Sequence, residues 1–160
     1  MDVADPRVLR DILRRHGVRA ATSLGQRFLV DRAVLAAIVE AAELSADDDV
    51  LEVGPGPGVL TAALASRVRS VTAVEVDPRM VALLEETLAD HKNVQVVQAD
   101  ALKVDLLGLS GRPVTRIVAN LPYQITTPLL ERFLADDRRP PLGSAFKSYP
   151  AARGQKQPSK

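Results

Sequence analysis

Residues Asn120 to Tyr123 read Asn-Leu-Pro-Tyr and follow an apolar segment over 114–119 that predicts a strand. The exocyclic amine of adenine is a weak nucleophile because its lone pair is delocalised into the ring. The side-chain oxygen of Asn120 and the carbonyl of Leu121 or Pro122 could accept its two N–H groups and aim the lone pair at a methyl donor. Pro122 stiffens the turn, and Tyr123 could stack on a base that has left its helix. An isolated tetrapeptide of this kind is also typical of an ordinary turn.

A glycine-rich loop, Gly54-x-Gly56-x-Gly58, lies directly between a predicted strand over 50–53 and a predicted helix over 59–67. Glycine lets the backbone turn sharply and come close to a ligand. No Gly-Lys-Ser/Thr follows, which excludes a phosphate-binding P-loop. The loop alone is weak support for a ligand site, because many strand-to-helix turns look alike.

Acidic residues end two further predicted strands. Glu75 closes a strand over 70–75, where a carboxylate could accept hydrogen bonds from ribose hydroxyls. Asp100 follows a strand over 94–97 and could accept from an adenine amino group, with the backbone of Ala101 and Leu102 beside the ring. Glu52, just before the glycine loop, could orient the loop or a ligand amino group. These residues indicate an adenosine-containing ligand, and they do not separate a nicotinamide cofactor from S-adenosylmethionine (SAM).

Strands that alternate with helices position these residues. Asp5-Pro6, Asp31 and Asp77-Pro78 each predict a helix start, and Thr127-Pro128 predicts the start of a last helix that ends near residue 134. The alternation predicts an α/β fold with a parallel, doubly wound sheet. In such sheets ligands bind at the carboxyl ends of the strands, so all three motifs share one edge.

Composition excludes several classes of protein. The 160 residues are 46% hydrophobic and contain no cysteine and two histidines, so no disulfide framework, thiolate centre or multi-histidine metal site is expected. No apolar run is long enough to span a membrane, and the charged N-terminus does not resemble a signal peptide, so we expect a cytoplasmic protein. The net charge of +1 divides into −3 over residues 1–135 and +4 over 136–160.

Four segments together resemble the ribosomal RNA adenine N6-dimethyltransferase family, of the bacterial small-subunit KsgA/RsmA type. They are Ser23–Asp31 (SLGQRFLVD), Leu51–Thr61 (LEVGPGPGVLT), Ala73–Pro78 (AVEVDP) with Gln98–Leu102 (QADAL), and Asn120–Pro128 (NLPYQITTP). The resemblance implies a Rossmann-like, SAM-dependent methyltransferase with sheet order 3-2-1-4. It also implies dimethylation of adjacent adenosines in 16S rRNA during assembly of the small (30S) subunit.

The resemblance assigns the site residues as well. Gln26, Arg27 and Leu29, with Phe28 beside them, lie over the cofactor, Gly54 and its loop pass the methionine part of SAM, and Glu75 binds the ribose. Asp100 and Ala101 contact the adenine of SAM, and the segment from Asn120 to Tyr123 holds the target adenine. Arg27 stands where the family usually has Asn, and Gln124 where bacterial members often have Asn or Tyr. No metal is implied, and a monomer is expected.

Family members continue well beyond the matching residues. We expect the resemblance to stop near Arg139, with residues 1–135 forming the N-terminal part of the methyltransferase domain and residues 136–160 a Pro-rich, basic, disordered tail. A truncated domain of this kind would leave the fourth strand as an open edge. We expect it to bind SAM weakly and to dimethylate rRNA poorly or not at all. The arginines at 7, 10, 14, 15 and 19 could contact RNA phosphates or form a solvated helix face.

Three alternatives remain open at this point. The first is the related large-subunit rRNA dimethyltransferase that confers macrolide resistance, which the Leu of Asn-Leu-Pro-Tyr and the Thr-Pro-Leu-Leu continuation disfavour. The second is a non-catalytic RNA-binding or ribosome-assembly module that keeps the fold. The third is an NAD-dependent dehydrogenase, which the Asn120–Tyr123 segment argues against.

Overall fold

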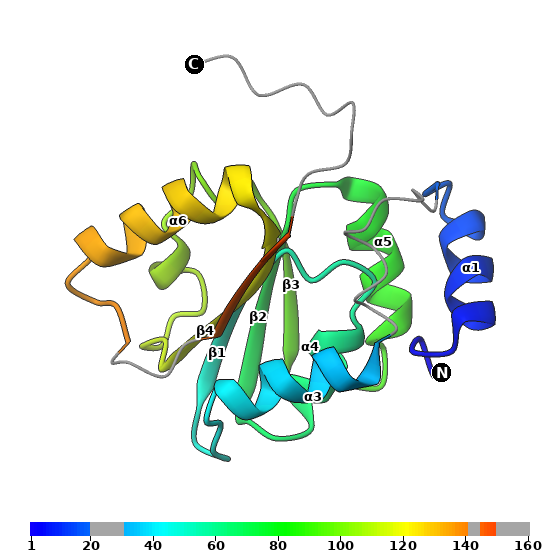
Figure 1. Ribbon diagram of the computed structural model, residues 1–160, viewed down its shortest axis with the longest axis horizontal. Coiled ribbons are helices and arrows are strands. Elements are labelled where there is room, and N and C mark those ends of the chain that lie inside the picture. The colour runs from blue at the N-terminus through cyan, green and yellow to red at the C-terminus, as the bar shows by residue number, and fades with distance from the viewer. Residues whose placement is uncertain (20–30, 141–144, 150–160) are drawn as a thin grey trace.

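The computed structural model describes residues 1–19, 31–140 and 145–149, and it contains a parallel β-sheet with helices on both faces (Figure 1). The strand order is β3-β2-β1-β4-β5, and every pairing among the described strands is parallel. The predicted Rossmann-like fold and its order 3-2-1-4 are confirmed. The strands are β1 (Asp49–Val53), β2 (Ser70–Glu75), β3 (Val94–Gln98), β4 (Arg116–Pro122) and β5 (Ala145–Tyr149).

Three helices begin at the aspartates that the sequence indicates. The carboxylate of Asp5 accepts from the backbone N–H of Arg7 at 2.8 Å, and that of Asp77 accepts from the N–H of Arg79 at 2.9 Å. Asp31 caps the next helix in the same way, so that N–H groups without a helical partner are satisfied. The helices are α1 (Pro6–Arg15), α3 (Arg32–Ala41), α4 (Val59–Ala65), α5 (Pro78–Thr87) and α6 (Tyr123–Ala135), with a 3₁₀ turn η2 (Leu106–Gly108).

Two apolar clusters hold the sheet between its helices. The first joins one face of the sheet to α3 and α4, and it includes Ile38, Val39, Val50, Leu60, Leu64, Val71 and Val118. The second joins the opposite face to α6 and η2, and it includes Leu51, Val53, Val74, Leu106, Ile117, Leu129 and Phe133. Since both faces are covered, the strands are apolar nearly throughout, and a polar side chain within them requires an explanation.

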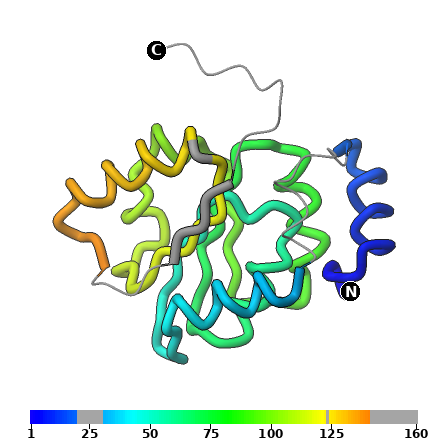
Figure 2. Tube along the Cα trace, in the orientation of Figure 1, coloured from blue at the N-terminus to red at the C-terminus, as the bar shows by residue number. Residues whose placement is uncertain are grey.

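Helix α1 packs on α5, at the far side of the molecule from α6 (Figure 2). Leu9, Ile12 and Leu13 of α1 form a buried cluster with Leu83 of α5. At the carboxyl end of α1, the ring Nε2 of His16 lies 2.6 Å from a carboxylate oxygen of Glu86. The guanidinium of Arg15 lies 2.9 Å from the other carboxylate oxygen of Glu86, so apolar burial and these polar contacts dock the N-terminal helix. Within the described ranges, no helix is long and apolar enough to cross a membrane.

The last helix begins earlier than its sequence predicts. The prediction placed its start at Thr127-Pro128, whereas β4 continues to Pro122 and α6 begins at Tyr123, with Pro128 inside the helix. Proline lacks an N–H, so its presence costs α6 one backbone hydrogen bond near the first turns, where few are formed. Strand and helix therefore follow one another with no residue between them.

A fifth strand corrects the expectation of an open edge at β4. Residues 145–149, within the segment predicted to be a disordered tail, form β5 and pair in parallel with residues 118–122. Prolines at 140, 141 and 150 and the lack of alternation hide this strand in the sequence. The division of the chain at residue 135 stays a prediction.

Candidate functional site

The carboxyl ends of β1, β2 and β4 lie at one level of the sheet. Val53 of β1 pairs with Val74 of β2 and with Ala119 of β4, so the residues that follow are neighbours across the edge. These residues are Gly54, Glu75 and Asn120. The strand register thus brings the three motifs together, as the fold type predicts.

Two glycines of the loop are required by close packing. Gly54 has φ +70°, and a Cβ added there would lie 2.5 Å from Cδ2 of Leu121. Gly58 has φ +92°, and a Cβ there would lie 3.0 Å from Cδ2 of Leu84 on α5. The first glycine therefore lets the loop meet the Asn-Leu-Pro segment, and the second lets α4 begin against α5.

A cleft of about 100 Å³ opens beside this edge. Its lining includes Gly54, Glu75, Asp100, Ala101 and Leu121, which come from the loop after β1, the end of β2, the loop after β3 and the end of β4. Gly56 and Gly58 do not line it. Gln26, Arg27 and Leu29, with Phe28, lie outside the described residues. The cleft thus unites the residues predicted for the ribose and the adenine of a ligand, and their roles stay predictions.

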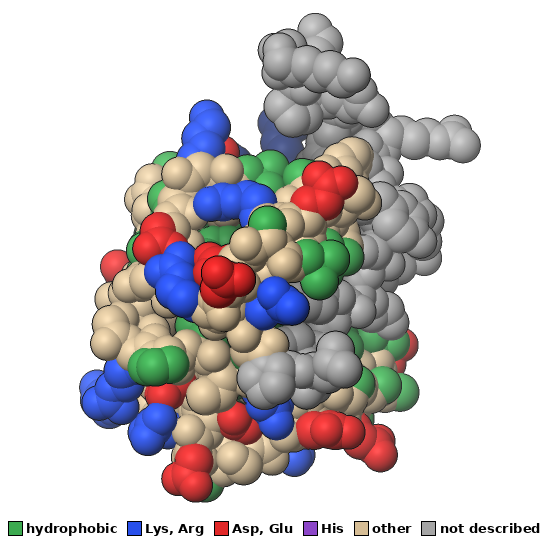
Figure 3. Space-filling model, turned by 90° about the vertical axis from the view of Figure 1, so that its left-hand side faces the viewer, with side chains coloured by type: hydrophobic (Ala, Val, Ile, Leu, Met, Phe, Trp, Pro, Cys, Tyr) green, Lys and Arg blue, Asp and Glu red, His purple; other side chains and the backbone are tan. Residues whose placement is uncertain are grey.

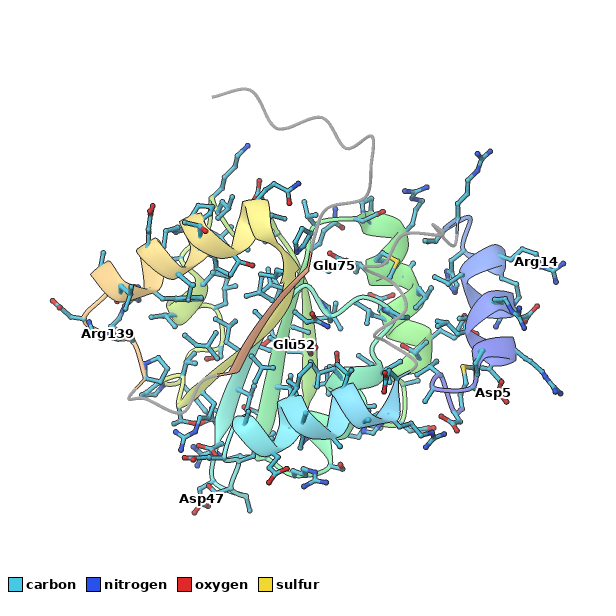
Figure 4. All side chains as sticks on the ribbon, viewed as in Figure 1. Asp5, Arg14, Asp47, Glu52, Glu75 and Arg139 are labelled. Atoms are coloured by element: carbon cyan, nitrogen blue, oxygen red, sulfur yellow. The ribbon has the colours of Figure 1, made fainter. Side chains whose placement is uncertain are left out.

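Glu75 lies at the end of β2, toward the upper end of the sheet in Figure 4, with Glu52 below it and Asp47 at the opposite end. Burial raises the pKa of the Glu75 carboxyl, and the neighbouring charge of Asp77 acts in the same direction. One carboxylate oxygen accepts from the N–H of Val76 at 2.8 Å. A half-buried acid with this partner is suited to accept hydrogen bonds from a polyol such as ribose.

Asp100 forms a local turn at the other wall of the cleft. Its Oδ1 accepts from the N–H of Leu102 at 2.9 Å, and Nζ of Lys103 lies 3.9 Å from Oδ2. An aspartate in this position commonly stabilises a turn, whether or not it also binds a ligand. It also fixes the direction of the backbone at Ala101, which lines the cleft.

Arg132 of α6 holds the same loop from outside. Its guanidinium donates to the carbonyl of Ala101 at 2.6 Å and to the carbonyl of Val104 at 2.7 Å. The α6 side of the molecule faces the viewer in Figure 3, where basic and acidic side chains are interspersed. Sequence reasoning missed Arg132, because its partners are backbone carbonyls 28 and 31 residues away.

Asn120 and Leu121 are buried at the end of β4, with Asn120 only 6% exposed. The Oδ1 atom of Asn120 is buried and has no hydrogen-bond partner. Pro122 ends the strand, and Tyr123 is the first residue of α6. The atom predicted to accept from an adenine amine therefore faces inward in this structure.

The environment of Glu52 is the feature of the site that the sequence indicated least. Glu52 is 1% exposed, one residue before the end of β1, and its Oε2 has no partner. Burial raises the pKa of the Glu52 carboxyl to about 7; the hydroxyl of Thr61 acts against this shift, and the charge of Glu75 adds to it. Burial, to which α3 and α4 contribute, is the main cause of this shift, and no short motif encodes that packing.

No cluster of three or more histidine, cysteine, aspartate or glutamate side chains suited to a metal ion occurs in residues 1–19, 31–140 and 145–149.

Comparison with known proteins places the chain in a family. The profile of the ribosomal RNA adenine dimethylase family matches residues 17–149. The chain belongs to this family. The match passes Arg139, where the resemblance was expected to stop, and it includes β5.

Two curated members of the family are each 46% identical to the chain. They are the ribosomal RNA small subunit methyltransferases A of Pediococcus pentosaceus, over 140 residues, and of Lactiplantibacillus plantarum, over 143 residues. The alignments cover 84% and 86% of this chain but 47% and 48% of those proteins. The chain spans about half the length of the curated relatives it matches.

Two solved structures of methyl-transferring enzymes have the same fold. The 23S rRNA methyltransferase ErmE aligns with a TM-score of 0.60 and 41% identity over 68% of this chain and 43% of its own. A dimethyladenosine transferase from Plasmodium falciparum aligns with a TM-score of 0.60 and 28% identity over 67% of this chain and 38% of its own.

Proposed function

We propose that the chain forms the SAM-binding part of an enzyme that dimethylates N6 of adjacent adenosines in small-subunit (16S) rRNA. The observation that carries the proposal is the cleft in which Gly54, Glu75, Asp100 and Leu121 meet beside Asn120. Membership in the ribosomal RNA adenine dimethylase family supports the reaction class. The names of the curated relatives support the small subunit as substrate.

The residues of the cleft fit the adenosine part of SAM. Glu75 is a half-buried acceptor at the end of β2, where it can accept from ribose hydroxyls, and Ala101 and Leu102 line the cleft where a flat ring would lie. When bound, SAM supplies a methyl group on a positively charged sulfur. The fixed acceptors of the sheet edge orient the two reactants, so positioning and electrostatics carry the catalysis.

The segment after β4 is proposed to hold the target adenine. The Asn120 oxygen and the carbonyl of Leu121 or Pro122 accept the two N–H groups of the amine, and Tyr123 stacks on the extruded base. The strand-to-helix junction at Pro122 fixes this segment, because no flexible residue separates β4 from α6.

RNA binding is proposed to involve α1. Arg7 and Arg10 are exposed on this helix, where they are free to approach phosphates. Arg14 is also exposed but pairs with Asp11, and Arg15 pairs with both Asp11 and Glu86. We propose the 30S assembly intermediate as partner, the cytoplasm as location and a monomer as the state of the chain.

Calorimetric titration of the chain with SAM tests the cofactor site. Glu75→Gln is expected to weaken binding by about tenfold, because the amide replaces one acceptor by a donor. Glu85→Gln, the same change at an exposed position of α5, serves as control. Equal affinity of the two variants would overturn the assignment of Glu75.

The large-subunit reaction is the second candidate, since ErmE is 41% identical to the chain. Primer extension across both rRNAs, after incubation of undermethylated ribosomal subunits with the chain and SAM, separates the two. Stops at adjacent adenosines of 16S rRNA support the proposal, and stops in 23S rRNA support the alternative. A third result, SAM binding with no stop in either rRNA, supports a binding module.

A further inference from the structure

A small cavity separates Glu52 of β1 from Asn120 of β4. It has a volume of about 10 Å³, room for about one water molecule, and its walls include apolar side chains of α3 and α4, namely Leu35, Ile38 and Leu60. Glu52 pairs with Val118, so Asn120 lies two residues further along the neighbouring strand, on the same face of the sheet. The two polar side chains therefore meet across this cavity.

The unpartnered oxygen atoms of these two lining residues are not complementary. Oε2 of Glu52 and Oδ1 of Asn120 are both buried without a hydrogen-bond partner. A carboxylate oxygen and an amide oxygen are both acceptors, so they repel one another unless a hydrogen lies between them. Burying a polar group without a hydrogen-bond partner costs free energy. An ionised carboxylate that faces an amide oxygen is therefore unfavourable.

Two arrangements remove the conflict with the residues at hand. A neutral Glu52 can donate its proton to Oδ1 of Asn120. An ionised Glu52 requires donors. The hydroxyl of Thr61, which is also buried without a partner, can supply one, and Asn120 supplies another when its amide turns by half a rotation and presents Nδ2. The second arrangement moves Oδ1 away from the cavity.

Few charged groups act on Glu52. Among the described residues, β2 contributes Glu75, whose negative charge opposes ionisation, and α4 contributes the Thr61 hydroxyl, which favours it. Helix α3 presents Leu35 and Ile38 to the cavity, and β4 presents Asn120. With burial as the main cause, the pKa of Glu52 is about 7, so both protonation states are populated near neutral pH.

We propose that Glu52 is a positioning residue that sets the orientation of the Asn120 side-chain amide. The neutral acid holds Oδ1 inward, and the carboxylate turns Oδ1 outward, toward the end of β4 where an adenine amine would be held. The use of this switch in methyl transfer rests on the proposed function, because only there does Asn120 meet a substrate. The orientation itself is a property of the chain without any ligand.

NMR of the whole 160-residue chain, without ligand, tests the coupling. The carboxyl carbon of Glu52 and the side-chain amide of Asn120 are followed from about pH 5 to about pH 9, a range that includes both states. We expect one midpoint for both signals. We also expect nuclear Overhauser effects from the amide protons to methyls of Leu35 and Ile38 only above that midpoint, when Nδ2 faces the cavity.

Variants separate coupling from a general structural change. Glu52→Gln cannot ionise and should leave the Asn120 signals independent of pH, whereas the control Glu85→Gln, at an exposed site, should preserve their titration. Asn120→Ala removes the donor and should raise the Glu52 midpoint. If Glu52→Gln does not fold, the shared midpoint in the unaltered chain and the shift in Asn120→Ala decide the question.

Three results would overturn the inference: amide contacts that do not change with pH, a bound water between the two side chains with a fixed amide, or Asn120 signals that titrate in Glu52→Gln. None of these measurements uses SAM or RNA. If the coupling is observed but the chain binds no SAM, the proposed function fails and the coupling stands.

Discussion

The two ends of β1 each bury a carboxyl group, and they treat it in opposite ways. Asp49, 2% exposed, accepts from the guanidinium of Arg69 and, at 2.6 Å, from the hydroxyl of Ser70. These partners hold its pKa below the usual range of an aspartate. Glu52, three residues further and 1% exposed, has an unpartnered oxygen and a pKa raised to about 7.

This difference distinguishes a buried acid whose partners lie within the fold from a buried acid that lacks partners. At the amino end of the sheet the buried acid has hydrogen-bond and ion-pair partners within the chain, so its removal would leave those partners unsatisfied. At the carboxyl end the acceptors of Glu52 and Asn120 are left without donors, which favours rearrangement or ligand binding. The pH dependence of stability should therefore have opposite signs at the two ends.

The largest effect is expected for Asp49→Ala. Arg69 and Ser70 lose their common acceptor, and the unfolding free energy should fall by about 3 to 4 kcal/mol, near the lower end for buried pairs because Arg69 is half exposed. Urea unfolding measures it. Asp47→Ala, an exposed acid two residues away, should stay within about 0.5 kcal/mol of the unaltered chain. Similar losses in both variants would contradict the assigned role.

Glu52→Gln tests the other end of the strand. A raised pKa means that the folded state binds the proton more tightly than the unfolded state, so Glu52 reduces stability as pH rises from about 4.5 through about 7. The unfolding free energy of the variant should therefore exceed that of the unaltered chain by on the order of 3 kcal/mol at about pH 8 and by less than about 1 kcal/mol at about pH 5. Unfolding curves at both pH values measure this, and a gain that is equal at both would refute the shift.

Gly54→Ala probes the close approach of the loop to β4. A Cβ at Gly54 would lie 2.5 Å from Leu121, and its φ of +70° is strained for alanine, so we expect a loss of about 2 kcal/mol. Gly111 has the same φ with no atom within 4 Å of an added Cβ. Gly111→Ala should therefore lose only the backbone part, about 1 kcal/mol. The difference between their thermal midpoints isolates the contact.

Arg132→Gln should have the smallest effect on stability and a specific effect at the cleft. Its two hydrogen bonds to the carbonyls of Ala101 and Val104 are exposed, so their loss should cost about 1 kcal/mol. Calorimetry should detect about a fivefold weaker affinity for SAM. Arg138→Gln, which breaks contacts with Asp105 and Asp136 instead, should leave SAM affinity unchanged.

Much of this framework is local and therefore predictable from the sequence. Asp5 and Asp77 cap helices because an aspartate followed by a proline satisfies the first N–H groups with atoms two residues away. The apolar strands with glycine or an acid at their ends predict a parallel sheet and its binding edge. The same local reasoning misplaced the start of α6, since the gain from continuing β4 into the helix outweighs the one bond lost at Pro128.

The parts that the sequence hides depend on distant partners. Strand β5 exists through its pairing with β4, which no pattern within residues 145–149 indicates. The raised pKa of Glu52 arises mainly from burial under α3 and α4. The role of Arg132 depends on carbonyl groups in a loop about thirty residues earlier. A short sequence motif does not indicate which distant residues will bury a side chain or which distant backbone groups it will bind.

Helix α6 follows β4 with no residue between them, so a movement of the helix is transmitted directly to the end of the strand. Its first residue adjoins Pro122, and Arg132, nine residues later and therefore about 14 Å along the axis, grips the carbonyls of Ala101 and Val104. If α6 tilts, the loop that contains Ala101 and Val104 must move with it, or the two hydrogen bonds from Arg132 must break. The wall of the cleft and the Asn120–Pro122 segment are thus mechanically joined, and neither can move far alone.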